Sequence, residues 1–118
     1  MVVDDNRINL KLACALLAGA GFEVLTAGDA EEALQVLKTH RPRLILMDIQ
    51  LPGMDGLALT RQLKSDPATQ GIVIVALTAY AMKGDEEKAR ASGCAGYLTK
   101  PLDSRTLAQS VARYIELN

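Results

Sequence analysis

The sequence predicts an α/β fold, a doubly wound parallel sheet in which five strands are flanked by five helices. Short β-rich runs alternate along the chain with longer stretches of helical periodicity, which is the pattern of repeated βα units. Two runs, Arg43–Asp48 and Ile72–Thr78, are apolar throughout instead of alternating between apolar and polar residues. Strands of that kind are covered on both faces, so helices are expected on both sides of the sheet.

The strands are expected at five places in the chain. In order, they are Val2–Val3, Phe22–Thr26, Arg43–Asp48, Ile72–Thr78 and Ala95–Thr99. The first run is shorter than a usual strand of about 5–6 residues. Whether the domain stands alone or is cut from a longer protein therefore stays open.

Helices are expected between these runs. The first follows Asp5, and the others occupy Gly28–Leu37, Asp55–Lys64, Gly84–Gly93 and Asp103–Ile115. Asp29 and Glu32 form a capping box at the start of the second helix. The fourth has acids first, bases later and Gly93 at its end, an order that suits the helix dipole and a glycine cap. Asp55 and Gly56 are expected to shape the loop into the third helix.

Composition narrows the class of protein. With 118 residues and a net charge of −1, the chain is expected to be one domain spanning residues 1–118 that does not bind nucleic acid. No stretch approaches the roughly 18 apolar residues of a membrane span, and no leader pattern is visible, so a cytoplasmic protein is expected. Cys14 and Cys94 are isolated and are expected to be reduced thiols.

Polar residues interrupt the apolar runs at one predicted edge of the sheet. The carboxyl ends of parallel strands meet there, and ligands bind beyond them. Asp4 and Asp5 follow the first strand, and Asp48 ends the third. Thr78 ends the fourth strand and Lys100 follows the fifth. These side chains are therefore expected to form one site.

Three carboxylates at one site need a cation to coexist. Oxygen ligands without His or Cys favour Mg²⁺, which also leaves room for phosphate oxygens. Lys100 adds a mobile positive charge and Thr78 a hydroxyl, both suited to a phosphoryl oxygen. An aspartate flanked by a metal and a lysine can act as a nucleophile toward phosphorus.

Four segments, "VVDDN", "LILMDIQLPGMDG", "ALTAYAMKGD" and "GYLTKPLD", resemble the receiver domain of two-component response regulators. The resemblance covers essentially the whole chain, with 43 residues from Asp5 to Asp48, 30 more to Thr78 and 22 more to Lys100. The residue pattern of these segments is closest to stand-alone regulators of the cell-division type and to receivers of hybrid kinases. It implies a flavodoxin-like fold with strand order 2-1-3-4-5. It also implies a phosphorylation-controlled switch that acts with a histidine kinase or histidine phosphotransfer protein and a downstream protein effector.

The resemblance also implies a role for each residue of the acidic site. Asp48 resembles the phosphoryl acceptor, Asp5 a direct Mg²⁺ ligand and Asp4 a ligand acting through water. The backbone carbonyl of Gln50 resembles the third protein ligand. The expected protein is an acceptor that phosphorylates and dephosphorylates itself, not a turnover enzyme.

Further roles concern the phosphoryl group and the switch. Lys100 resembles the phosphate-binding cation, and its peptide bond to Pro101 is expected to be cis. Thr78 resembles a switch hydroxyl that moves toward the phosphoryl group. Tyr97 resembles the aromatic residue that then turns inward.

Other interpretations compete with these roles. A phosphatase of the haloacid-dehalogenase kind also uses an aspartyl nucleophile, but it needs a second Asp two residues later, where this chain has Gln50. A receiver that binds partners without phosphorylation is a further alternative. In a purely structural interpretation, these residues have no role in a site. Asp4 and Asp5 would then only cap the first helix, Thr78 would cap a strand end, and Tyr97 would be an ordinary strand aromatic.

The first helix is predicted to carry a second apolar stripe. At 100° per residue, the face assigned to the sheet consists of Leu10, Ala13, Leu17 and Ala20. The opposite face, predicted to dock the phosphohistidine protein, carries Ile8, Leu12 and Ala15. The alternative is that Ile8 and Leu12 are scattered surface residues or pack on the last helix.

Overall fold

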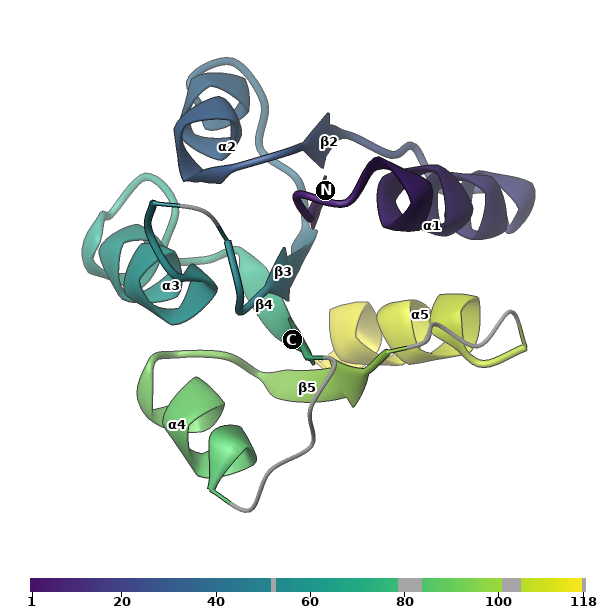
Figure 1. Cartoon of the computed structure of the whole chain (residues 1–118). Helices are drawn as coiled ribbons and strands as arrows, with labels where there is room; N and C mark the ends of the chain where they lie inside the picture. Colours follow the sequence, from purple (N-terminus) through teal and green to yellow (C-terminus); the bar gives the residue numbers. More distant parts are fainter. Residues whose placement is uncertain (52, 79–83, 101–104, 118) are drawn as a thin grey trace.

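The computed structural model describes residues 1–51, 53–78, 84–100 and 105–117 (Figure 1). These residues form a five-stranded parallel sheet in the order β2-β1-β3-β4-β5, which confirms the predicted fold class and strand order. The strands are β1 (Val2–Val3), β2 (Thr26–Ala27), β3 (Leu44–Asp48), β4 (Val73–Thr78) and β5 (Gly96–Thr99). The helices are α1 (Arg7–Gly19), α2 (Ala30–Leu37), α3 (Gly56–Ser65), α4 (Asp85–Ala91) and α5 (Leu107–Leu117).

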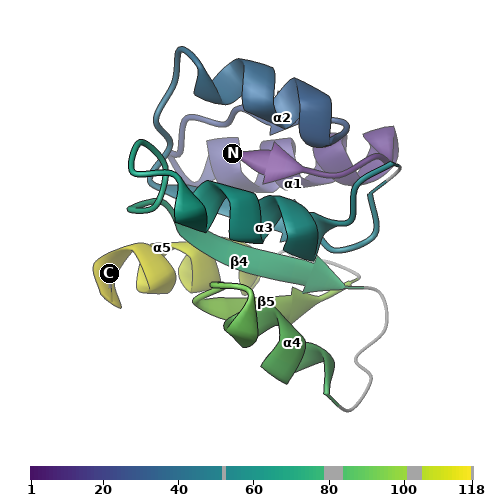
Figure 2. The same cartoon turned by 90° about the vertical axis from the view of Figure 1, so that its left-hand side faces the viewer.

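Helices cover both faces of the sheet. In Figure 1 the sheet is seen nearly edge-on, with α1 and α5 on one side and α2, α3 and α4 on the other, and Figure 2 looks onto the latter layer. Alternate residues of the central strands serve the two layers. Ile45 and Ile74 pack with α2, α3 and α4, while Leu46 and Val75 pack with α1 and α5. This two-sided burial explains why these runs are apolar throughout.

The second strand is much shorter than predicted, so the expected strand Phe22–Thr26 is wrong over most of its length. Strand β2 lies at the edge of the described sheet and pairs with β1, with Val2 opposite Thr26 and Val3 opposite Ala27. Because β1 has only two residues, only two residues of β2 can pair with it. The preceding residues instead line a groove of about 400 Å³, together with residues 40–44 and apolar side chains of α1 and α5.

The helix starts follow from their capping residues. The Asn6 side chain accepts hydrogen bonds from the backbone N–H groups of Ile8 and Asn9, at 2.9 and 3.2 Å. Asn6 is thus the N-cap of α1, and the alternative role of Asp4 and Asp5 as its caps is wrong. At α2, the Asp29 side chain accepts from the Glu32 backbone N–H at 2.7 Å, as predicted.

The remaining predictions concern the two cysteines, the sheet face of α1, membrane spans and the peptide bond before Pro101. Cys14 and Cys94 are free, as expected, and Cys94 is buried. Ala20 was assigned to the sheet face of α1 but is exposed, because it lies at the C-cap where the helix has ended. No helix within the described residues is long and apolar enough to cross a bilayer. The predicted cis bond before Pro101 lies outside the described residues.

Candidate functional site

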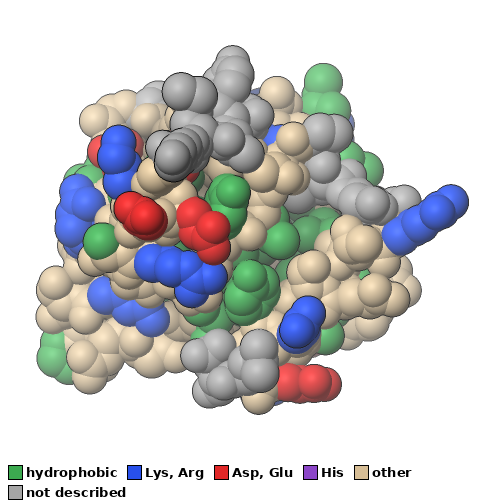
Figure 3. All heavy atoms as spheres, turned by 90° about the horizontal axis from the view of Figure 1, so that it is seen from below, with side chains coloured by type: hydrophobic (Ala, Val, Ile, Leu, Met, Phe, Trp, Pro, Cys, Tyr) green, Lys and Arg blue, Asp and Glu red, His purple; other side chains and the backbone are tan. Residues whose placement is uncertain are grey.

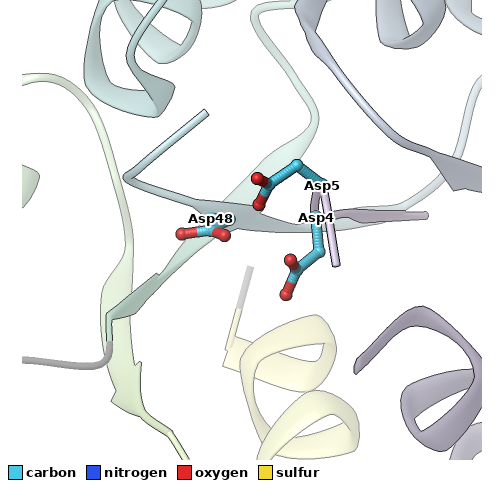
Figure 4. A group of neighbouring side chains, drawn as sticks. All are labelled: Asp4, Asp5 and Asp48. Atoms are coloured by element: carbon cyan, nitrogen blue, oxygen red, sulfur yellow. The ribbon is translucent and has the colours of Figure 1, made fainter. Parts of the chain in front are cut away.

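Three carboxylates gather at the carboxyl edge of the sheet. Val3 of β1 pairs with Met47 of β3, so the next residues of the two strands, Asp4 and Asp48, are brought together. One carboxylate oxygen from each of Asp4, Asp5 and Asp48 lies within 4.8 Å of the other two, and Figure 4 shows the three side chains together. Asp4 and Asp48 are 1% and 4% exposed, whereas Asp5 is exposed. The cluster is therefore closed on its inner side and open to solvent on the side of Asp5.

Lys100 lies between the two buried acids. Its Nζ is 2.9 Å from Oδ2 of Asp4 and 3.0 Å from Oδ2 of Asp48. The Lys100 backbone N–H donates to the carbonyl of Thr78 at 2.8 Å, which fixes the start of its side chain at the end of β4. The sequence predicted that Lys100 would reach this site. That one ammonium group would bridge both Asp4 and Asp48 was not predicted.

Backbone amides hold the other oxygens of the same two acids. Asp4 Oδ1 accepts from the Asn6 N–H at 2.9 Å, and Asp48 Oδ1 accepts from the Gln50 N–H at 3.0 Å. Each carboxylate thus has one oxygen on an amide two residues later and the other on Lys100. This turn geometry is common for Asp, and it orients both carboxylates before any ligand binds.

Burial and charge shift the acidity of two groups in the site. Burial raises the pKa of Asp48 and the charge of Asp4 adds to this effect, while the Gln50 amide and Lys100 oppose it. Burial would lower the pKa of Lys100, but the hydrogen bonds and charges of Asp4 and Asp48 outweigh it and the net shift is upward. Lys100 therefore stays cationic, and a single ammonium group cannot balance three carboxylates.

The donor set at this edge fits a hard divalent cation. All three side chains offer oxygen atoms, no His or Cys belongs to the cluster, and the exposed Asp5 leaves an open side for water. Mg²⁺ prefers oxygen ligands, is bound through one or two carboxylates and keeps several waters. The residues present therefore fit Mg²⁺.

Thr78 and Tyr97 lie on one face of neighbouring strands. Thr78 ends β4, is 5% exposed and pairs with Thr99 of β5. Ala76 pairs with Tyr97, so Tyr97 lies two positions before the end of the strand on the same face as Thr78. Tyr97 is half-buried against the core under α3 and α4.

The apolar stripe on α1 is exposed. Ile8 is 76% and Leu12 42% exposed, and Ala15 is also exposed. The alternative that Ile8 and Leu12 pack on the last helix is therefore not supported. Ala13 and Leu17 of the opposite face are buried, as predicted.

Sequence reasoning assigned Gly56 only to the shape of a loop, yet it lies directly against the backbone of Asp48. The signal available was weak. A glycine just inside a helix is unfavourable by about 1 kcal/mol relative to alanine. Such a residue needs a reason, and here the reason is a close approach that only the fold creates.

The fold and the acidic pocket define a class of protein, the receiver domains of response regulators. The family described as "Response regulator receiver domain" matches residues 1–112, so the chain belongs to this family. The chain is 43% identical to the polar-differentiation response regulator DivK of Brucella anthropi over 115 residues, covering 98% of this chain and 94% of the relative. DivK of Brucella abortus is 42% identical over the same length.

Solved structures agree with this assignment. The receiver domain of NtrX from Brucella abortus has a TM-score of 0.90 and 29% identity, covering 99% of this chain and 98% of that one. The chemotaxis response regulator CheY4 of Vibrio cholerae has a TM-score of 0.89 and 28% identity, covering 96% and 94%. The predicted resemblance is confirmed. The chain is a DivK-like, phosphorylation-controlled signalling switch, and the phosphatase alternative is not favoured.

Proposed function

We propose that Asp48 accepts a phosphoryl group from a phosphohistidine protein in a Mg²⁺-dependent reaction, and that residues 1–118 act as one receiver domain. The observation that carries this proposal is a buried carboxylate, 4% exposed, held 3.0 Å from an ammonium group and beside two further acids. A carboxylate so oriented needs little rearrangement to attack, and such positioning supplies much of the catalysis in phosphoryl transfer.

The metal ligands in this proposal are Asp5, Asp48 and the backbone carbonyl of Gln50, with Asp4 acting through water. When bound, Mg²⁺ neutralises charge on the phosphoryl oxygens and so allows an anionic donor near three acids. The exposed side of Asp5 supports this assignment, because it leaves room for water and donor at that position.

The transfer step uses groups of this chain for orientation and charge. An oxygen of Asp48 forms the bond to phosphorus while the bond from phosphorus to the histidine nitrogen of the donor breaks. The Gln50 amide holds the Asp48 carboxylate during the attack. Lys100, already 3.0 Å from Asp48, binds an oxygen of the incoming group.

The switch in this proposal is the pair Thr78 and Tyr97. The Thr78 hydroxyl moves toward the phosphoryl group, and Tyr97 turns into the vacated space on the same face of the sheet. The face seen in Figure 3, from the side of β5, α4 and α5, carries exposed apolar side chains with both basic and acidic side chains beside them. A downstream protein effector that binds this face would contact Tyr97 differently in the two states of the switch.

The switch is tested by removing the Thr78 hydroxyl. Thr78→Ala should still become phosphorylated, but the affinity of the variant for its effector should no longer depend on phosphorylation. Calorimetric titration measures this affinity.

The phosphoryl donor is a histidine kinase or a histidine phosphotransfer protein that docks on Ile8, Leu12 and Ala15. Exposed apolar side chains on one stripe of α1 support this surface, and the helix begins directly after the acid pair. The chain is not a turnover enzyme in this proposal, because Gln50 stands where the phosphatases have their second Asp. In this proposal the phosphoryl group is lost by autodephosphorylation.

The test is the mass of the intact protein after incubation with Mg²⁺ and acetyl phosphate, which needs no docking surface. One added phosphoryl group that is absent without Mg²⁺ supports the proposal. An unchanged mass would refute it, and sustained release of phosphate from small phosphoesters would favour the phosphatase instead.

A further inference from the structure

The first residue of α3 lies in contact with the backbone of the proposed acceptor. Gly56 is buried, and a Cβ atom added to it would overlap the carbonyl oxygen of Asp48. The same atom would lie 2.9 Å from the Asp48 carbonyl carbon and from Cα of Ile49. These are backbone atoms, which cannot rotate away as a side chain can. Any residue larger than glycine must therefore push β3 and α3 apart at this point.

Hydrogen bonds keep this close approach in place. The Gly56 N–H donates to the carbonyl of Ile49 at 2.8 Å. The hydroxyl of Thr60, which is fully buried, donates to the carbonyl of Gly56 at 2.8 Å. On the other side, the Ile49 N–H donates to the carbonyl of Leu77 at 3.1 Å. The turn after Asp48 is thus fixed between α3 and β4.

The geometry at the site depends on this turn. The Gln50 N–H that orients the Asp48 carboxylate lies one residue after Ile49. The proposed metal-binding carbonyl of Gln50 belongs to the same segment. A shift of the Asp48–Ile49 backbone would therefore move the nucleophile, the amide that orients it and a metal ligand together.

We propose that Gly56 is a positioning residue for phosphoryl transfer, and that Thr60 supports it by holding the Gly56 carbonyl. The absence of a side chain at Gly56 lets α3 set the position of the Asp48–Gln50 backbone. The inference rests on the proposed role of Asp48 as acceptor. It goes beyond that role because it assigns part of the reaction rate to a residue that contacts neither the metal nor the donor.

The size of the effect follows from the size of the clash. Ordinary contacts of Cβ atoms begin at 3.4 Å. Alanine at Gly56 therefore requires the Asp48–Ile49 backbone to retreat by on the order of 1 Å, and a misplacement of about 1 Å can cost roughly 100-fold in rate. We expect Gly56→Ala to lower the maximal rate of labelling by at least about tenfold.

Two other glycines of the chain provide matched controls. At Gly71 an added Cβ meets no atom within 4 Å, so Gly71→Ala tests the substitution itself. At Gly96 an added Cβ overlaps the hydroxyl end of Tyr114, a side chain that can move aside, so Gly96→Ala introduces a milder clash away from the site. Gly96 begins β5, at the opposite end of that strand from Lys100. Gly96→Ala therefore controls for lost stability without a change at the site.

The experiment measures three quantities on all variants: the thermal midpoint, the labelling rate against acetyl phosphate concentration with saturating Mg²⁺, and the ¹H–¹⁵N signal of Gln50. Gly56→Ala should lower the maximal rate with a smaller change in KM and should shift the Gln50 amide. Gly96→Ala should lose stability yet keep the wild-type rate and Gln50 signal, and Gly71→Ala should match wild type. A wild-type rate for Gly56→Ala, or equal rate losses in Gly56→Ala and Gly96→Ala at equal stability, would overturn the inference.

Thr60→Val keeps the test decisive if Gly56→Ala does not fold. Valine has nearly the same shape but cannot donate to the Gly56 carbonyl, so a smaller rate loss of about 2–5-fold and a smaller Gln50 shift are expected. A wild-type rate and an unmoved Gln50 signal in this variant would contradict the proposal. Failure of the proposed function looks different, because wild type would then remain unlabelled or Asp48→Asn would be labelled.

Discussion

Strands β1 and β3 each deliver one buried acid to the same edge of the sheet, but they are supported very differently. All five residues of β3 pair with β4, and α3 presses on the turn that follows Asp48. Strand β1 has two residues, with two pairs to β2 and two to β3. The two strands therefore differ in how firmly each holds its acid in place, β3 more firmly than β1. The proposed nucleophile Asp48 lies on the firmly held side, whereas Asp4 and Asp5, the other two acids of the proposed metal site, lie on the lightly held side.

The largest expected effect is on the firmly held side. Asp48→Asn should reduce labelling by acetyl phosphate and Mg²⁺ by roughly 100-fold or more, because the amide has nearly the same shape but is a poor nucleophile. Intact-protein mass spectrometry measures the effect, and circular dichroism checks that the fold is kept. Labelling of Asp48→Asn at the wild-type rate would show that another residue is the acceptor.

The docking surface on α1 lies beside the lightly held acids and gives the next largest effect. Leu12→Glu should slow transfer from a cognate phosphohistidine protein by about tenfold, because it places a charge in an apolar contact. Labelling by acetyl phosphate should not change. Ala18→Glu, at another exposed position of the same helix, is the control for the added charge. Equal loss with both donors, or no loss with either, would rule out this surface.

The lightly held side itself is tested through its exposed acid. Asp5→Ala should weaken Mg²⁺ binding by at least roughly tenfold, because it removes a proposed direct ligand and even the loss of an outer-shell partner costs about 10–100-fold. Without metal, the same change should raise the thermal midpoint, since it removes repulsion with Asp4 and Asp48. Wild type should be stabilised by millimolar Mg²⁺. Calorimetric titration measures Mg²⁺ binding, and thermal unfolding measures the change in midpoint. A thermal midpoint of wild type that stays the same when Mg²⁺ is added would contradict the metal site.

The smallest expected effect is the pH dependence of stability without metal. The pKa of Asp48 is raised above 3.8 in the folded state, chiefly by burial, so the folded protein binds this proton more tightly than the unfolded chain. The contribution of Asp48 is therefore fully present below pH 3.8 and is lost as the pH rises through the folded pKa.

Asp48→Asn lacks this titration, so it serves as the reference. Relative to Asp48→Asn, wild type should lose unfolding free energy as the pH rises from about 3.5 to 7, because the raised pKa of Asp48 favours the folded state only while the carboxyl is protonated. Urea unfolding at several pH values, with chelator present, measures the difference. A difference that stays constant or grows in favour of wild type would contradict the direction of the shift.

Much of the site was predictable because its residues break the apolar pattern. Asp4, Asp48 and Thr78 each stand where a buried run ends, so their type and position are enough to place them at one edge of the sheet. The helix starts at Asp29 and Asp55 were predictable for a similar reason, because capping is local and both side chains cap as their types suggest.

What escaped prediction depends on partners that are distant in sequence. The run from Phe22 to Thr26 has strand composition, but the length of an edge strand is set by its neighbour, and β1 is short. The contact of Gly56 with Asp48 arises only when α3 folds back on β3. The sharing of Lys100 between Asp4 and Asp48 likewise depends on how three strand ends meet.

The position of Lys100 also connects strand β4 to strands β1 and β3 at the carboxyl edge of the sheet. Its backbone is tied to the end of β4 through the Thr78 carbonyl, and its side chain is tied to the ends of β1 and β3 through two carboxylates. A displacement of Thr78 therefore pulls on the same residue that holds the acid pair together. One lysine thus links the ends of three strands through one backbone hydrogen bond and two ion pairs.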